Sequence, residues 1–314
     1  MKFLQKKQSA GVITPKQQAD LDKLEEFFDK YNKAITPNAD PKKLAKLQKQ
    51  LKDKQDELDK IRKRYGLEDD KFSQTRKDNA HWFKDKKKAD SVIRGKAGEV
   101  WQAATDDEKR WIFEYTQSYH KYNEPLRGIE YGTNKFLGVG NVDLDQIGVK
   151  QYGFKPGEIK KQMDCIESII DKSSYDFDMW LQRGLNGSKG ISSFLEIDEA
   201  IWNGATEKEL QDVLVGKTIT EHAFCSTAAA KGNGFSGDLI CNIYAPKGTK
   251  MMYVEPISRF GNDDGLSWDG KSGQSSFGSE FEMILQRGTR FKITKVERKN
   301  GRTFIDLDII EQKA

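Results

Sequence analysis

The chain has 314 residues, of which 36% are hydrophobic and 32% charged, and its formal net charge is +4. This length allows one large domain or two ordinary ones, with enough apolar residues for a sizeable core. No stretch approaches the roughly 20 apolar residues of a transmembrane helix, and the N-terminal residues lack the apolar run of a signal peptide. The three cysteines and three histidines show no metal-ligand spacing, so the sequence predicts no zinc site.

The charge is unevenly distributed along the chain, which indicates two modules. Residues 1–95 contain 25 Lys and Arg against 16 Asp and Glu, a balance of +9, so residues 96–314 carry −5. Within the first module, apolar residues recur at spacings of three and four over residues 21–35 and again over residues 44–65. This spacing is typical of amphipathic helices, and a proline-containing segment separates the two stretches. We therefore expect a basic α-helical hairpin.

The lysine-rich faces of this first module allow two interpretations. They form an ordinary solvated surface, or they attract an acidic protein or an anionic membrane and so serve delivery, docking or regulation. Nucleic acid is not expected as a partner, because few aromatic residues are interleaved with the lysines. We place the domain boundary near residue 95, where the composition changes after the charged run Lys84–Lys88.

The second module begins with expected helices and continues with short expected strands. One helix is predicted from Asp106 to about Pro125, and another over residues 156–173. Strand-like runs follow at residues 177–181, 218–226, 239–244, 250–254, 280–285, 290–296 and 303–309. Helices followed by a series of strands predict an α+β domain with antiparallel sheets.

Two carboxylates stand two positions apart at the start of the expected strand 280–285. Because successive side chains of a strand point to opposite faces, Glu280 and Glu282 are expected on one face. Such a pair indicates either a catalytic cleft or exposed acids on an edge strand. A second Glu-x-Glu, at residues 207–209, instead matches a helix capping box that begins with Thr206.

Three expected strands carry polar residues in this order: Trp180–Gly184 with Arg183, Ala223–Ala228 with Ser226 and Thr227, and Glu280–Glu282. The order resembles the Arg, Ser-Thr-Ser and Glu-x-Glu signature of the mono-ADP-ribosyltransferase toxins. Residues 107–128 are similar to the helix that opens the catalytic domain of clostridial binary-toxin enzymatic components and Rho-modifying exoenzymes. The resemblance covers about residues 100–312, and Ala228 departs from it, because the signature has a serine there.

The resemblance implies an ADP-ribosyltransferase fold of two packed, mainly antiparallel sheets with flanking helices. It also implies NAD as a substrate and no metal. Glu282 would hold the ribose and stabilise the cation that forms as nicotinamide leaves, Ser226 would orient Glu282, and Arg183 would contact the phosphates. The other residues expected beside NAD are Tyr119, Asn123, Arg127, Gly184, Thr227 and Phe235.

The resemblance further implies the acceptor. In these toxins a glutamate at the position of Glu280 accompanies arginine acceptors, so Glu280 is expected to orient a target arginine and take its proton. Phe277 lies in the expected target-recognition loop, residues 260–280. The implied activity is arginine-specific mono-ADP-ribosyl transfer to a protein, and actin is the most familiar acceptor of the family.

Two other functions stay open at this point. The same site can hydrolyse NAD with water as the acceptor, which would make the protein an NAD glycohydrolase. Alternatively, the chain is a structural component of a phage particle or secretion apparatus, or a phage-encoded modifier of host proteins. A toxin or effector would be secreted or injected and act in the cytosol of a target cell, whereas a phage enzyme would act in the host cytoplasm.

Overall fold

The structure is a computed structural model of the chain. It describes residues 74–130, 135–232, 236–258, 260–261 and 280–312, together with Asp53 and Trp268. The chain divides into two compact units, Met1–Asp70 and Lys71–Ala314. The expected helical hairpin lies outside the described residues apart from Asp53, so the architecture given below is that of the second unit. The boundary expected near residue 95 falls inside helix α5 of this unit.

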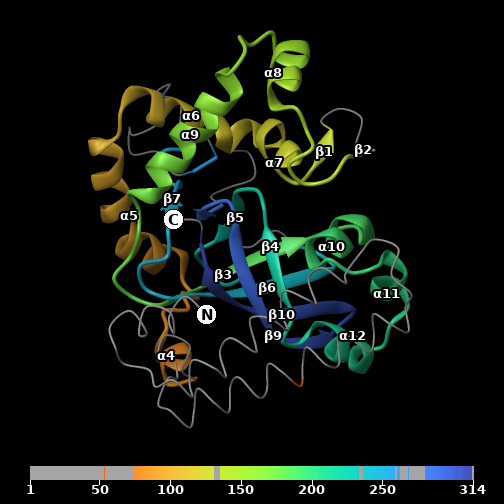
Figure 1. The fold of residues 1–314 in the computed structure, drawn as a ribbon. Helices are drawn as coiled ribbons and strands as arrows, with labels where there is room; N and C mark the ends of the chain where they lie inside the picture. The colour runs from red at the N-terminus through yellow and green to blue at the C-terminus, as the bar shows by residue number, and fades with distance from the viewer. Residues whose placement is uncertain are drawn as a thin grey trace, which may run out of the picture. The chain divides into compact units, whose positions relative to one another are not determined.

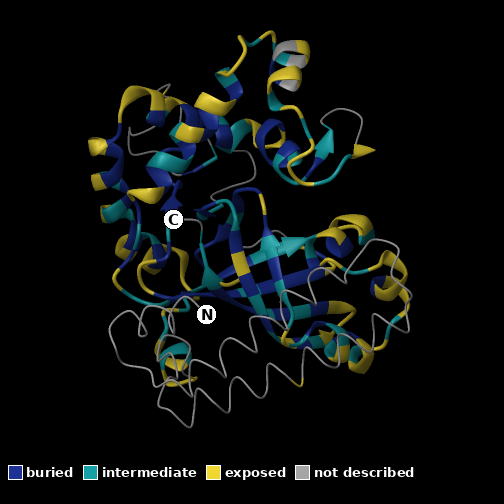
Figure 2. Ribbon diagram, viewed as in Figure 1, coloured by how far each residue is buried: buried dark blue, intermediate teal, exposed yellow. Residues whose placement is uncertain are grey.

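The structure describes nine helices in the second unit. They are α4 (Gln74–Asn79), α5 (Lys86–Ala103), α6 (Asp106–Ser118), α7 (His120–Leu126), α8 (Leu144–Tyr152), α9 (Glu158–Asp171), α10 (Ser188–Leu195), α11 (Glu199–Gly204) and α12 (Glu207–Leu214). Helices α5, α6 and α9 lie near strand β7, whereas α10, α11 and α12 lie beside strands β4 and β9 (Figure 1). Most of these helices are exposed on the side that faces away from the sheet and buried on the opposite side (Figure 2).

Capping boxes begin two of these helices. At α6 the Thr105 side chain accepts from the Glu108 amide, and the Glu108 carboxylate accepts from the Thr105 amide. Thr206 and Glu209 make the same pair of contacts at α12, which confirms the capping prediction for residues 207–209. The single helix expected from Asp106 to Pro125 is divided at Tyr119, which keeps helical dihedral angles, so the break between α6 and α7 is local.

The strands form one large sheet and one small one. The large sheet contains β3 (Met179–Leu185), β4 (Thr218–Glu221), β5 (Cys225–Ala228), β6 (Leu239–Ala245), β7 (Met251–Tyr253), β8 (Glu282–Leu285), β9 (Thr289–Lys299) and β10 (Arg302–Glu311). Within the described residues, its eight strands follow the order β4-β9-β10-β6-β3-β5-β8-β7, and only the pairing of β10 with β6 is parallel. The small sheet pairs β1 (Ile129–Glu130) with β2 (Lys135–Phe136). The predicted α+β class with mainly antiparallel pairing is confirmed.

The sheet differs from the expectation in its connections. The eight strands form a single hydrogen-bonded series instead of two separate sheets. However, β3 and β5 share only the register pair Gln182 and Ala228, so the two halves of the series meet through a narrow contact. The expected strand 218–226 is two strands, because β4 pairs with β9 while β5 pairs with β8. Residues 222–224 therefore carry the chain from one half of the sheet to the other.

The core lies between the sheet and the helices that cover it. One face of α9 is fully buried, as its apolar spacing predicts, and α6 buries Trp111, Ile112 and Tyr115. Burial of such side chains contributes roughly 1.5–3 kcal/mol each. This packing fixes the inner face of α6 against β5. Among the described helices, none is long and apolar enough to cross a membrane.

Candidate active site

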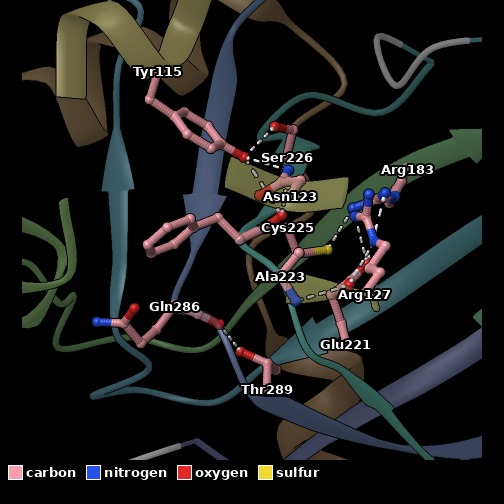
Figure 3. Close-up of polar contacts among 11 residues, drawn as sticks. Tyr115, Asn123, Arg127, Arg183, Glu221, Ala223, Cys225, Ser226, Gln286 and Thr289 are labelled. Carbon is pink, nitrogen blue, oxygen red and sulfur yellow. Dashed lines mark hydrogen bonds and ion pairs between the residues drawn. The ribbon is translucent and has the colours of Figure 1, made fainter. Parts of the chain in front are cut away.

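A tyrosine and an asparagine from α6 and α7 meet at strand β5. Asn123 Nδ2 donates to Tyr115 Oη at 3.0 Å and to the Phe224 carbonyl oxygen at 3.1 Å. Tyr115 Oη in turn lies 3.5 Å from Ser226 Oγ (Figure 3). Burial raises the pKa of Tyr115, and the charge of Glu282 raises it further. The tyrosine therefore stays protonated at neutral pH and can donate a hydrogen bond beside Ser226.

The strand pair β5 and β8 places the predicted catalytic acid next to the Ser-Thr element. Glu282 is the first residue of β8 and lies opposite Ala228 of β5. Thr227 on β5 donates its hydroxyl hydrogen to the Met283 carbonyl oxygen at 2.8 Å, and its side chain is buried. Thr227 thus links the two strands and stabilises their register, which includes the neighbouring pair Ala228 and Glu282.

The Glu282 carboxyl group has an unusual protonation equilibrium. Burial raises its pKa to about 7, and the negative charges of Glu280 and Glu255 act in the same direction. A hydrogen bond to Ser226 and the positive charge of Arg183 oppose the shift. A carboxyl group of this kind exchanges its proton near neutral pH, which is typical of active sites.

The backbone departs from a regular strand between the two carboxylates. Strand β8 begins at Glu282, and Phe281 before it has a left-handed φ of 51°. The alternation expected for Glu280 and Glu282 does not hold across this residue. The two side chains are nevertheless close enough for the charge of Glu280 to raise the pKa of Glu282. The left-handed residue between them is a feature that the sequence did not indicate.

Two arginines converge on one buried carboxylate at the end of β4. Arg127, just after α7, donates from Nε and Nη2 to the two carboxylate oxygens of Glu221, each at 2.9 Å. Arg183 Nη2 lies 3.8 Å from Glu221 Oε2, and Arg183 Nη1 donates to Cys225 Sγ at 2.9 Å (Figure 3). Although burial alone would raise it, the charges of Arg127 and Arg183 hold the pKa of Glu221 below its usual range. The cluster is therefore an ionised arginine pair with one shared counter-ion.

Sequence reasoning missed three members of these clusters, namely Tyr115, Glu221 and Cys225. The segment 218–226 reads as one strand, so the sequence did not indicate that Glu221 and Cys225 lie on different strands on either side of a crossing. The available signal for Glu221 was weak, since a carboxylate at the end of a β-branched run is common at surfaces. Tyr115 belongs to the apolar face of an amphipathic helix, which predicts burial and no more.

The other residues expected beside NAD differ in their surroundings. Asn123 is 2% exposed, and its Oδ1 has no hydrogen-bond partner among the described residues although Nδ2 has two. Tyr119 is exposed and stacks on His120 with ring centroids 4.0 Å apart. Gly184 lies on β3 opposite Ile240 of β6. Asn123 is thus the member of this set with an unused buried acceptor.

Most of the expected target-recognition loop, residues 260–280, and one residue expected beside NAD lie outside the described residues. This applies to Phe277 and to Phe235. Of the described residues, no group of histidine, cysteine, aspartate or glutamate side chains could hold a metal ion.

The sequence of this unit matches one family of enzymes. Residues 79–312 match the model of the ADP-ribosyltransferase exoenzyme family, and this range contains both polar clusters. The chain belongs to the ADP-ribosyltransferase exoenzyme family. The resemblance to mono-ADP-ribosyltransferase toxins is therefore confirmed, and the protein is an enzyme of the ADP-ribosyltransferase class. No curated protein matches the chain by sequence.

Solved exoenzymes share the fold of this ADP-ribosyltransferase. C3stau2 from S. aureus, solved with NAD, has a TM-score of 0.54 and 16% identity, over 74% of this chain and 99% of that chain. The Clostridium limosum C3 exoenzyme has a TM-score of 0.51 and 18% identity, over 74% and 98%. Plx2a from Paenibacillus larvae has a TM-score of 0.50 and 19% identity, over 74% and 100%. At these identities the similarity establishes the fold.

Proposed function

We propose that this exoenzyme cleaves NAD between nicotinamide and ribose and transfers ADP-ribose to an arginine side chain of a target protein. The observation that carries the proposal is the setting of the Glu282 carboxyl group. This group forms a hydrogen bond with Ser226, has a pKa of about 7 and lies beside Glu280. C3stau2, which shares the fold, was solved with NAD, and this supports NAD as the substrate here.

The polar clusters suit the two chemically different parts of NAD. Arg127 and Arg183 offer adjacent guanidinium groups that stay charged, a donor set that matches a diphosphate. Glu221 offsets one of their two positive charges in the free protein. Asn123 Oδ1 is a buried acceptor without a protein donor among the described residues, so it suits an N–H group of the ligand. The proposed contacts of Tyr119, Gly184, Thr227 and Phe235 with NAD stay predictions.

The proposed reaction needs a negative charge at Glu282. When the bond between ribose C1′ and the nicotinamide nitrogen breaks, its electron pair leaves with nicotinamide and the ribose develops oxocarbenium character. The Glu282 carboxylate stabilises that positive charge, while Ser226 keeps the carboxylate in place. A nitrogen of the target guanidinium then bonds to C1′, and its proton passes to the Glu280 carboxylate. Charge and protons balance without a metal or a redox partner.

A direct test with labelled NAD should distinguish the roles of the two carboxylates. Glu282→Gln is expected to abolish both NAD hydrolysis and labelling of protein, because no charge then stabilises the ribosyl cation. Glu280→Gln should retain hydrolysis, since water needs no help from that carboxylate, and should reduce labelling of arginine by about 100-fold. The measurement is label released into solution against label retained on protein.

The outcomes of this test distinguish the candidate functions. Equal loss of both activities in Glu280→Gln contradicts the proposed roles. Hydrolysis by the wild-type enzyme with no labelled protein in a cell lysate identifies an NAD glycohydrolase instead. Actin is the first purified acceptor to assay, and we propose that the enzyme acts as a secreted or injected toxin or effector whose N-terminal unit, Met1–Asp70, serves delivery or docking.

A further inference from the structure

A third carboxylate lies beside the proposed catalytic pair. Glu255 belongs to the turn that follows β7 and is 1% exposed. Its Oε2 accepts a hydrogen bond from the Phe281 amide at 2.8 Å. This amide belongs to the residue between Glu280 and Glu282, so Glu255 binds the backbone that joins the two acids. The roles proposed above do not use it.

The conformation of Phe281 needs such support. A bulky residue with φ of 51° lies in the left-handed region, which costs roughly 1–2 kcal/mol and persists only where the surroundings enforce it. Glu255 holds the amide, and the Phe281 carbonyl oxygen accepts from the Ala229 amide at 3.0 Å. The Phe281 side chain is buried, and Lys86 Nζ lies 5.5 Å from the centre of its ring. The backbone is therefore held at both polar groups.

The turn that carries Glu255 is itself joined to the strand of Glu282. The Val254 amide donates to the Glu282 carbonyl oxygen at 3.0 Å, and the Ser258 amide donates to the Val254 carbonyl oxygen at 2.8 Å. Gly261 packs so closely against the Glu255 carbonyl group that a side chain there would overlap it. These contacts hold Glu255 at a fixed position relative to Glu282. The hydrogen bond from the Phe281 amide to Glu255 then fixes Phe281 relative to both.

We propose that Glu255 is a positioning residue that, through the Phe281 amide, sets the direction of Glu280 relative to Glu282 and so aligns the arginine acceptor with the ribose. The inference rests on the proposed function for the identity of the acceptor. It assigns Glu255 no contact with NAD or with the target. It also explains why a left-handed phenylalanine separates the two acids, because a regular strand there would point Glu280 along a different direction.

The negative charge of Glu255 also affects the pKa values of the two neighbouring acids, which gives a second way to test its role. Burial raises the pKa of Glu280, and the charge of Glu255 raises it further. The pKa of Glu282 is raised by burial and by the charges of Glu280 and Glu255, whereas Arg183 and the Ser226 hydroxyl lower it. Tyr115 stays protonated on the α6 side. Removing the Glu255 charge alone should therefore lower the pKa of Glu282 and leave these other groups in place.

Two substitutions separate the hydrogen bond from the charge. Glu255→Gln keeps an oxygen that accepts from the Phe281 amide, so at pH 8 we expect transfer to arginine within about threefold of wild type. Because the charge is lost, the acidic limb of its pH–rate profile should move to lower pH. Glu255→Ala loses the acceptor, and a misplaced Glu280 should reduce kcat for transfer by about 10- to 100-fold while hydrolysis falls much less. Glu297→Gln and Glu297→Ala, at a partly exposed glutamate of β9 that pairs with Lys295, are the matched controls.

Every outcome of this comparison is decisive. An unchanged ratio of transfer to hydrolysis in Glu255→Ala overturns the positioning role, as does a Glu255→Gln variant that loses as much transfer as Glu255→Ala and shows no pH displacement. If Glu255→Ala does not fold by circular dichroism, the pH profile of NAD hydrolysis by Glu255→Gln decides, and an unmoved acidic limb overturns the inference. If the wild-type enzyme hydrolyses NAD but modifies no arginine, the proposed acceptor is refuted. The pH profile of NAD hydrolysis by Glu255→Gln still tests the effect of Glu255 on Glu282 in that case, so failure of the acceptor and failure of the Glu255 role are distinguishable.

Discussion

At the scale of single residues, the chemistry depends on how the surroundings adjust the charge of Glu282. Burial and the neighbouring acids raise the pKa of Glu282, Ser226 and Arg183 lower it, and the result is a pKa of about 7. The proposed reaction uses the deprotonated form, so the rate should increase as pH rises through this region. In the complex, the positive nicotinamide ring of NAD favours the carboxylate and should move the acidic limb to lower pH.

Substitution of Ser226 tests this electrostatic account. The Ser226 hydroxyl lowers the pKa of Glu282, so its removal in Ser226→Ala should raise that pKa and move the acidic limb of kcat/KM for NAD hydrolysis to higher pH. We expect about a tenfold loss of activity at pH 6 and a smaller loss at pH 9. The measurement is a pH–rate profile, and a loss of equal size at every pH would show that Ser226 does not act through the protonation of Glu282.

Substitution of Glu221 tests the shared counter-ion of the arginine pair. Glu221→Gln keeps the shape of the side chain but leaves Arg127 and Arg183 without its charge in a largely buried place. Breaking a buried ion pair from one side costs about 3 kcal/mol, so we expect a comparable loss in the free energy of unfolding. Denaturant unfolding measures it, and inorganic pyrophosphate should stabilise the variant more than the wild type. A loss below about 1 kcal/mol would contradict the counter-ion role.

At the scale of elements, the alignment of α6 with α9 holds Tyr115 beside β5. Glu108 in the first turn of α6 accepts from Lys172 Nζ and Ser168 Oγ, both at 2.5 Å. Although burial alone would raise it, these bonds and the Thr105 amide lower the pKa of Glu108 to about 2. The stabilisation is therefore complete above the unfolded-state pKa of about 4.5 and is lost as pH falls toward 2.

Glu108→Gln is expected to lower the free energy of unfolding by about 2 kcal/mol at pH 7. The difference from wild type should shrink as pH falls below about 4.5 and disappear near pH 2, because wild-type Glu108 then becomes neutral too. Urea unfolding at several pH values provides the measurement. Glu209→Gln is the control, since Glu209 has the same capping position in α12 but is exposed and should cost less. A pH-independent difference for Glu108→Gln would contradict the ionic interaction.

The same elements show what could be predicted from sequence. Periodicity identified the buried face of α9 and most strands, and the order of Arg183, Ser226 and Glu282 indicated the family. Periodicity could not indicate that residues 222–224 cross the sheet, because no glycine, proline, asparagine or aspartate separates β4 from β5. It could not indicate the left-handed Phe281 either, since an aromatic residue between two acids ordinarily favours an extended strand. For the same reason the sequence did not indicate that Glu221 binds the two arginines or that Glu255 binds the Phe281 amide.

At the scale of the whole molecule, a catalytic unit of the exoenzyme family follows a basic N-terminal unit. The family match begins at residue 79, and the compact catalytic unit begins at Lys71. Residues 1–70 contain 17 Lys and Arg against 13 Asp and Glu, a balance of +4, whereas residues 71–314 contain 36 of each. We propose that the N-terminal unit serves delivery or docking.

The central claim is that the enzyme attaches ADP-ribose to arginine. The most direct measurement is mass spectrometry of peptides from target-cell lysate after incubation with NAD and either the wild-type enzyme or Glu280→Gln. The account predicts a discrete set of peptides carrying ADP-ribose on arginine with the wild type, and their loss with Glu280→Gln while nicotinamide is still released. ADP-ribose on another residue type, or nicotinamide release without any modified peptide, would contradict it.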